Sequence, residues 1–284
     1  MRNFFNKIRE KLLKNEKNIQ FLNELKIING QILSNQNKIL SKEIHESEFK
    51  IFSQFGEDGI IQFILNTIKI SKKTFIEFGV ENYEEANTRF LLECNNWNGL
   101  IIDNSAENIN FIKKQNYFWK YDLKVEKKFI NKENINQIFL NNNMQGDIGI
   151  LSIDIDGNDY WVWKEINVVN PDLVIIEYNA RFGPSRSVTI QYDPNFKRNK
   201  TNNLIYGASL NALKKLGEIK GYKLIYVNKN GNNAFFIKKD LLNENFKEIS
   251  VDEGFVKNSF NELINVKEKS IFEKQLKLSK LVEV

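Results

Sequence analysis

The chain has 284 residues, 42% of them hydrophobic and 12% aromatic, which is enough for one sizeable core and an appendage. No apolar run approaches the roughly 18 residues that a membrane span needs. Charges interrupt every apolar run of the first 26 residues, so we expect a cytoplasmic protein without a signal peptide or transmembrane segment. The 41 basic and 36 acidic residues give a net charge of +5 with the signs well mixed, which is not the charge distribution of a nucleic-acid-binding protein.

The chain contains one cysteine, Cys94, and one histidine, His45. A single cysteine excludes intrachain disulfides and cysteine metal clusters, and we interpret it as a packing residue at the end of a predicted helix. A single histidine excludes His-rich zinc sites and disfavours a Ser-His-Asp triad. Acid–base chemistry in this chain therefore has to use Asp, Glu, Lys or Tyr.

Residues 1–47 are helical in character and form the first of three predicted segments. Apolar residues recur there at steps of three, four and seven, with Asn15 in one seam position. The seam consists of Phe5, Ile8, Leu12, Ile19, Leu22, Leu25, Ile32 and Ile39. Such a helix needs a second copy of itself, the back of a globular domain, or a membrane surface. Its polar face mixes Glu with Lys, so we favour a homo-oligomer.

The segment 49–65 predicts a helix that starts near Glu57 or Asp58, although Ser53 is also a possible N-cap. Polar residues, Gln54 among them, gather at its amino end. They either cap the helix or reach over the neighbouring strand end, where they would help to hold a cofactor.

The most informative stretch runs from Phe75 to Leu92, with a predicted strand at 75–78, a turn at Gly79 and a helix at 84–93. In an open α/β sheet, ligands bind at the carboxyl ends of the strands. One glycine is too few for the dinucleotide-binding turn, and no GxxxxGK[ST] loop occurs in the chain. The acidic Glu77 beside this turn favours a cationic ligand such as S-adenosylmethionine over a phosphate. The alternative is that Glu77 only caps a loop and Gly79 is an ordinary turn glycine.

Residues 99–105 predict the second strand, which ends at Asp103 and Asn104. An acidic residue at this place, about 20 residues past the glycine turn, can accept hydrogen bonds from ribose hydroxyls. This favours a nucleoside-containing cofactor.

Residues 117–123 predict the third strand, between helices at 106–115 and 133–141. Asp122, with Leu123 beside it, would then lie where it can meet the exocyclic amine of adenine.

The fourth strand, 147–153, leads into the carboxylates Asp154, Asp156 and Asp159. Like charges this close have to be solvated, protonated or neutralised by a cation. An EF-hand loop is excluded, because its later ligands and final Glu are missing.

The fifth strand, 171–179, ends in Glu177, Tyr178 and Asn179. Parallel strands four and five bring their carboxyl ends together, so Asp154, Glu177 and Asn179 would offer oxygen ligands for Mg²⁺. A hydrogen-bonded polar rim without metal is the alternative interpretation.

Residues 180–209 form a long irregular stretch, which in a compact domain is typical of a functional loop. We interpret it as a substrate lid, with Arg186, Tyr192, Lys197 and Arg198 among its polar and cationic side chains. Candidate substrate contacts are Tyr178, Asn179, Arg181, Tyr206 and Asn233. A helix at 210–219, a hairpin of strands 223–228 and 234–238, and a charged helical tail at 241–284 complete the prediction.

Five βα units followed by an antiparallel hairpin resemble the layout of class I S-adenosylmethionine-dependent methyltransferases. The stretches FIEFGV, LIIDN and ILSIDIDG are similar to their first, second and fourth motifs. The set SQFGEDG, EFGV, DIDGND and NNAFF resembles the FkbM-like branch, over residues 49–239. The resemblance implies a Rossmann-like, doubly wound, seven-stranded α/β sheet with an antiparallel terminal hairpin in a domain of residues 48–240, preceded by the long helix.

The resemblance also implies methyl transfer from S-adenosylmethionine to a sugar or small phosphorylated precursor of a cell-surface polysaccharide, with oxygen favoured over nitrogen as the acceptor atom. Cofactor contacts would be made by Gln54, Asp58, Glu77, Gly79, Asp103, Asn104, Asp122, Leu123 and Asp154. Catalytic candidates are Asp154, Asp156 and Glu177. Two alternatives stay open: a metal-dependent sugar-nucleotide enzyme, and a Rossmann-like binding protein without catalysis.

Overall fold

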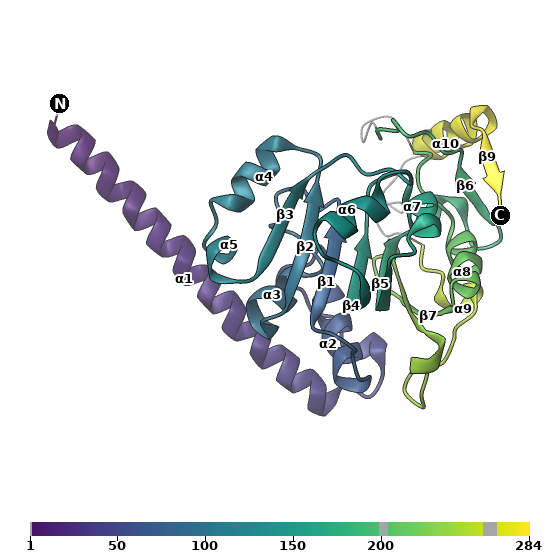
Figure 1. Cartoon of the computed structure of the whole chain (residues 1–284), viewed down its shortest axis with the longest axis horizontal. Coiled ribbons are helices and arrows are strands. Elements are labelled where there is room, and N and C mark those ends of the chain that lie inside the picture. Colours follow the sequence, from purple (N-terminus) through teal and green to yellow (C-terminus); the bar gives the residue numbers. More distant parts are fainter. Residues whose placement is uncertain (1, 199–203, 258–265) are drawn as a thin grey trace.

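The chain folds around one seven-stranded sheet with helices on both faces (Figure 1). The computed structural model describes residues 2–198, 204–257 and 266–284; the side chains of residues 2–17, 19 and 266–269 lie outside this description. The strand order is β3-β2-β1-β4-β5-β8-β7. The strands span Thr74–Phe78 (β1), Asn98–Asp103 (β2), Leu123–Lys127 (β3), Gly146–Ile153 (β4), Val169–Glu177 (β5), Tyr222–Val227 (β7) and Asn233–Lys238 (β8).

Strands β1 to β5 are parallel, and β8 pairs antiparallel with both β5 and β7. This arrangement confirms the predicted Rossmann-like doubly wound sheet with an antiparallel terminal hairpin. From β1 the chain passes first to β2 on one side and later to β4 on the other. The strand order therefore reverses at β1, and a crevice opens there at the carboxyl ends of the strands.

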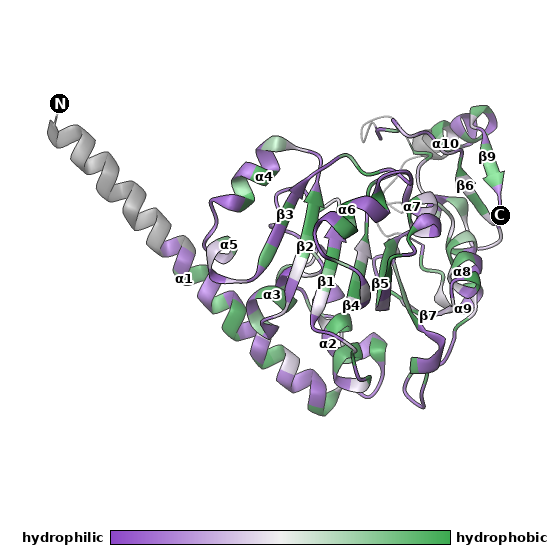
Figure 2. Cartoon of the chain, in the orientation of Figure 1, coloured by the Kyte–Doolittle hydropathy of each residue, from purple (hydrophilic) through white to green (hydrophobic). Residues whose placement is uncertain are grey.

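The two faces of the sheet carry separate apolar layers because successive side chains of a strand point to opposite sides. In β1, Phe75 packs in the layer under α2, α3 and α4, whereas Ile76 and Phe78 pack in the layer under α6, α7 and α8. Figure 2 shows hydrophobic residues along β2 and β5, as expected for strands buried on both faces. The helices span Glu57–Thr67 (α2), Arg89–Asn95 (α3), Ala106–Lys113 (α4), Ile135–Asn141 (α6), Asp159–Glu165 (α7) and Leu210–Ile219 (α8).

The first helix, α1, spans Arg2–Leu40 and packs against α2 and α3. Gly30 allows the close approach, since a Cβ there would lie 2.4 Å from the ring of Phe90. Asn37 donates from Nδ2 to the carbonyl of Ser47 at 2.6 Å. The predicted helix is confirmed. Of the predicted seam, the side chains of Phe5, Ile8, Leu12, Asn15 and Ile19 lie outside the described residues.

Two predicted elements differ from the structure, one in where it begins and one in its type. The helix predicted at 84–93 begins only at Arg89, because the preceding loop is tied down by Glu77. In place of the strand predicted at 117–123, residues Asn116–Lys120 form a short helix, α5, and β3 follows it. The ring of Tyr117 is buried edge-on against Tyr83 at 5.8 Å between centroids, and this tertiary contact favours the helix.

The predicted lid and the carboxyl-terminal tail form a small unit with its own apolar cluster. Strand β6 (Val188–Ile190) pairs antiparallel with β9 (Leu281–Glu283), and Phe272 of α10 (Val266–Leu278) packs with Phe182. The tail is therefore only partly helical. The remaining short elements are η1 (Ile44–Glu46), η2 (Ala180–Phe182), η3 (Lys239–Leu241) and α9 (Val251–Gly254). Within the described part of the chain, no helix is long and apolar enough to cross a membrane.

Candidate functional site

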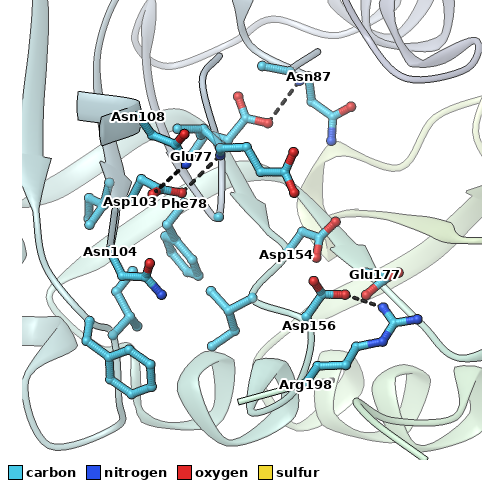
Figure 3. Close-up of a pocket in the computed structure, with 18 of the residues that line it drawn as sticks. Glu77, Phe78, Asn87, Asp103, Asn104, Asn108, Asp154, Asp156, Glu177 and Arg198 are labelled. Carbon is cyan, nitrogen blue, oxygen red and sulfur yellow. Dashed lines mark hydrogen bonds and ion pairs between the residues drawn. The ribbon is translucent and has the colours of Figure 1, made fainter. Parts of the chain in front are cut away.

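A cavity of about 480 Å³ opens at the carboxyl ends of β1, β2, β4 and β5, at the point where the strand order reverses (Figure 3). Its size lies within the range of small-molecule sites. The loop after β1, the segment after β3 and the lid residues Phe196 and Arg198 complete its wall. Nine of the predicted site residues line it: Gln54, Glu77, Gly79, Asp103, Asn104, Asp154, Asp156, Glu177 and Asn233.

Gly79 is required by the packing of two strand ends. Its φ is +79°, and a Cβ on it would lie 1.4 Å from the carbonyl oxygen of Asp154. The backbone of the β1 turn therefore lies directly against the end of β4. Glu81 and Tyr83 also have positive φ, of 49° and 62°. Left-handed conformations of residues other than glycine concentrate at functional sites.

Glu77 fixes the loop that follows β1. Its carboxylate accepts the backbone N–H groups of Asn87 at 2.9 Å and Thr88 at 3.0 Å, and the hydroxyls of Thr88 and Ser152. These four donors match the roughly four acceptor positions of a carboxylate. Burial raises the pKa of Glu77, and these hydrogen bonds oppose the increase. Glu77 therefore caps this loop, and a direct cofactor contact by its side chain stays a prediction.

Asp103 ends β2 as predicted and points toward the cavity (Figure 3). One carboxylate oxygen accepts Ser105 N at 2.7 Å and Asn108 Nδ2 at 3.1 Å, and the other accepts Glu81 N at 3.0 Å. Three donors leave about one of its four acceptor positions for a ligand hydroxyl. Asn104 follows on the same wall.

Three carboxylates converge at the ends of β4 and β5. Ligand oxygens of Asp154, Asp156 and Glu177 lie within 4.8 Å of one another. Asp159 is turned away into its own loop, where it accepts the N–H groups of Ile155 and Gly157, both at 2.8 Å. The pKa of Glu177 is raised well above its ordinary value by burial and then by the negative charges of Asp154 and Asp156.

Arg198 of the lid brings a positive charge to this cluster. Its Nη1 is paired with Asp156, and its guanidinium lies 3.4 Å from the ring centroid of Tyr206. The Asp156 carboxylate is therefore already paired with a cation, and Glu177 lies beside this ion pair (Figure 3). Asp156 itself has a φ of +57°.

Replacing Glu177 by Gln is expected to flatten part of the pH dependence of stability. Because its folded-state pKa is raised, Glu177 contributes stability below its unfolded pKa of about 4.3, and this is lost as pH rises through the folded pKa. At pH 8 we expect Glu177→Gln to be more stable than the native chain by more than about 1 kcal/mol, with a smaller difference at pH 5.

Urea unfolding at several pH values measures this effect. The exposed Glu244→Gln is the control for the loss of one negative charge. An unchanged pH profile in Glu177→Gln would show that this carboxyl is not strained at neutral pH.

Asn233 lines the cavity but is also part of a buried network that joins the hairpin to α2. Glu57 accepts from the amides of Asn228 at 2.7 Å and Asn233 at 2.8 Å, and from Phe55 N at 2.9 Å. The hairpin turn is thereby locked to the segment that carries Gln54. A contact of Asn233 with substrate stays a prediction.

Asp58 does not line the cavity, contrary to the prediction that it binds the cofactor. It is buried, and one of its oxygens accepts the N–H groups of Ile51, Phe52 and Ser53 at 2.7 to 2.8 Å. Its role is to shape the loop before α2. Burial raises its pKa to about 6 against the effect of these hydrogen bonds.

The predicted positions of Asp122 and Leu123 are also wrong, because the strand starts later than expected. Leu123 is the first residue of β3 and is paired with Gly99 near the start of β2. Both residues therefore lie at the amino ends of the strands, on the opposite edge of the sheet from the cavity, and cannot contact the same ligand.

Four predicted substrate contacts are not among the residues that line the cavity: Tyr178, Asn179, Arg181 and Tyr206. Tyr178 is buried and donates to the carbonyl of Val256 at 2.8 Å. Asn179 donates from Nδ2 to the Leu204 and Tyr206 carbonyls and accepts Arg181 N, so it anchors the lid, and its contact with a metal stays a prediction.

Several lining residues are missing from the predicted site. Among them are Glu81, Glu85, Asn87, Asn108, Lys128, Phe129, Ile130, Asn158 and Phe196, together with Arg198, which is predicted only as part of the lid. Three of them follow β3 directly. The alternation of Leu123 and Val125 with charged residues is the signal that would have placed this strand end correctly.

Comparison with known proteins gives only distant structural likenesses. No protein-family model matches the chain, and no curated protein matches it. Among solved structures, the N-terminal domain of EvdMO1 with SAH bound has a TM-score of 0.42 and 10% identity, covering 73% of this chain and 94% of that one.

A putative caffeoyl-CoA O-methyltransferase from Staphylococcus aureus has a TM-score of 0.42 and 15% identity, covering 74% of this chain and 99% of that one. An S-adenosylmethionine-dependent methyltransferase from Clostridium acetobutylicum has a TM-score of 0.40 and 10% identity, with coverage of 74% and 99%. At such scores the assignment of the fold rests on the strand order of this chain.

Proposed function

We propose that this chain is an S-adenosylmethionine-dependent methyltransferase that methylates an oxygen of a small hydroxylated acceptor. The observation that supports this most directly is the charge of the cavity wall. Seven carboxylates line it, against the two cations Lys128 and Arg198. The acidic residues are Glu77, Glu81, Glu85, Asp103, Asp154, Asp156 and Glu177. Such a wall favours a ligand with sulfonium and ammonium groups and opposes a pyrophosphate.

The geometry of the wall fits a nucleoside at one end and a reacting group at the other. Asp103 offers an acceptor position to a ribose hydroxyl, and Phe129 and Ile130 provide apolar surface next to it. The three carboxylates at the ends of β4 and β5 lie on the other side of the cavity. We assign the cofactor to the β1–β2 side and the acceptor to the side nearer the lid.

S-adenosylmethionine, when bound, supplies a strongly electrophilic methyl group, so the protein has to align the acceptor and remove its proton. The carboxylate of Asp156 is already engaged in an ion pair with Arg198. Burial and the neighbouring carboxylates raise the pKa of Glu177, and a carboxylate with a raised pKa is a stronger base. We therefore assign proton removal to Glu177, and to Asp154 and Asp156 the negative field that raises its pKa.

The acceptor class follows from the resemblance to the FkbM-like branch and from the cation in the lid. We propose a sugar or a small phosphorylated precursor of a cell-surface polysaccharide, with Arg198 near its anionic part. Three clustered carboxylates also suit Mg²⁺. Because Arg198 already brings a positive charge to Asp156, we propose that cofactor binding does not depend on a metal.

Calorimetric titration with S-adenosylhomocysteine tests the proposal. We expect micromolar binding by the native chain, unchanged by EDTA, and affinity at least about tenfold weaker in Asp103→Asn, because a hydrogen bond to a charged acceptor is lost. Asp122→Asn is the matched control, since this carboxylate lies at the other edge of the sheet and its replacement should change nothing.

Two results would contradict the proposal. Absence of binding at millimolar S-adenosylhomocysteine, together with tight binding of a nucleotide diphosphate sugar in the presence of Mg²⁺ or Mn²⁺, would favour a sugar-nucleotide enzyme. Absence of binding of either ligand by a folded chain would favour a binding protein without catalysis.

A further inference from the structure

The described side chains of helix α1 form a mixed polar and apolar face that packs on the domain and a second, apolar face that remains exposed. The least exposed positions among its described side chains are Asn23, Ile27, Gly30, Leu33, Ser34 and Asn37. Contacts from this face reach α2, α3 and the segment before α2. The steps of three and four between these residues define one stripe along the helix.

A second stripe consists of large apolar side chains that remain exposed. Phe21 is 58% exposed, Leu25 38%, Ile28 51%, Ile32 49% and Ile39 82%. Including Asn35, the spacing of this stripe is 4-3-4-3-4, which is a heptad repeat with one polar position. At about 100° per residue, the stripe is centred about 180° from the docked face. We call these six residues the outer seam.

The contacts of the docked face therefore leave the apolar side chains of the outer seam uncovered. Monomeric proteins rarely expose a continuous row of large apolar residues, and such a row marks an interaction site. An average spacing of 3.5 residues is typical of a helix that pairs with another helix, because it keeps successive apolar side chains on the side that faces the partner. Asn35 is the one polar residue in this seam, and a polar residue at such a position lowers the stability of the pairing.

The charges beside the outer seam indicate which helix covers it. Glu24 and Lys38 occupy equivalent flanking positions, fourteen residues apart. In an antiparallel pair of α1 helices centred near Gly30, Glu24 of each copy would face Lys38 of the other. The same alignment sets Phe21 against Ile39 and Ile28 against Ile32. A membrane surface would be favoured by cationic flanks, whereas these flanks carry one charge of each sign.

We propose that the outer seam of α1 pairs antiparallel with the same seam of a second copy, forming a symmetric dimer. Each catalytic domain lies on the docked face of its own α1, so the two domains would stand on opposite sides of the helix pair. This interface is independent of the cavity and of the proposed function.

Sedimentation velocity over a concentration series tests the pairing with the full chain. We expect twice the monomer mass for the native protein. Ile32→Asp buries a charge at the centre of the seam and should weaken dimerisation at least about 100-fold. Ile219→Asp is the matched control, because Ile219 is an 81% exposed isoleucine on α8, away from the seam. Near-ultraviolet circular dichroism confirms that each variant is folded.

A charge exchange tests the orientation. Glu24→Lys alone should weaken the dimer several-fold, and adding Lys38→Glu should restore it, because opposite charges face again. No restoration would overturn the antiparallel register. A native chain that is monomeric at 100 μM, a dimer insensitive to Ile32→Asp, or a monomer that instead binds anionic phosphatidylserine vesicles would each overturn the proposal.

Discussion

Gly79→Ala is expected to destabilise the protein by more than about 4 kcal/mol, an effect well above that of an ordinary point substitution. Two causes add. The residue has a φ of +79°, which costs a residue with a Cβ about 1–2 kcal/mol. The new methyl group would also lie 1.4 Å from the carbonyl oxygen of Asp154, so the paired ends of β1 and β4 would have to separate.

Gly146→Ala separates the two causes. Gly146 has nearly the same φ, +74°, but a Cβ there meets no atom within 4 Å. Its replacement should cost only the backbone term of about 1–2 kcal/mol. Urea denaturation of both variants measures the difference. Equal losses of free energy would mean that the strand ends accommodate the methyl group, and that this turn needs Gly79 for its backbone conformation alone.

Arg89→Met is expected to destabilise the protein by about 3–5 kcal/mol, because it leaves Glu93 buried without its partner. The Nε of Arg89 lies 2.6 Å from Glu93 Oε1, and both side chains are only 8% exposed. The guanidinium also stacks between the rings of Phe52 and Tyr117, at 4.4 and 4.7 Å. Methionine keeps much of the apolar contact but none of the charge.

The double variant Arg89→Met/Glu93→Gln should be more stable than the sum of the two single effects predicts, by at least about 1 kcal/mol. A second consequence concerns the cavity. Arg89 donates to the carbonyls of Tyr83 and Glu84, so its loss should loosen the loop after β1 and weaken S-adenosylhomocysteine binding in calorimetry. Strictly additive free energies would show that the ion pair is not what holds this side chain in place.

The parts of the site that the sequence predicts correctly are those that depend on strand ends. Asp103, Asp154 and Glu177 fall on one rim because parallel buried strands are recognisable as apolar runs and their carboxyl ends meet. Gly79 is predicted in the turn for the same reason. No long-range contact has to be known to make these assignments, and the structure brings these residues to one cavity.

The errors arise where a distant contact decides the local conformation. The aromatic run at residues 117–121 has strand propensity, yet the packing of Tyr117 on Tyr83 makes it a helix, so Asp122 lies at the edge opposite to the predicted one. Asn179 has the right chemistry for a ligand, but its amide holds carbonyls 25 and 27 residues away. Nothing in the neighbouring sequence indicates such partners.

The pairing of β6 with β9 has a consequence for the order in which the parts of the protein fold. Ser187 and Val284 are joined by hydrogen bonds across 97 residues, next to the paired strands β6 and β9. Contacts so distant in sequence form slowly, since a long loop has to close before they contribute. The last strand of the seven-stranded sheet ends at Lys238 and β9 begins only at Leu281, so the large sheet can form before β6 pairs with β9. The crevice at the carboxyl ends of the parallel strands would thus form before the small sheet of β6 and β9.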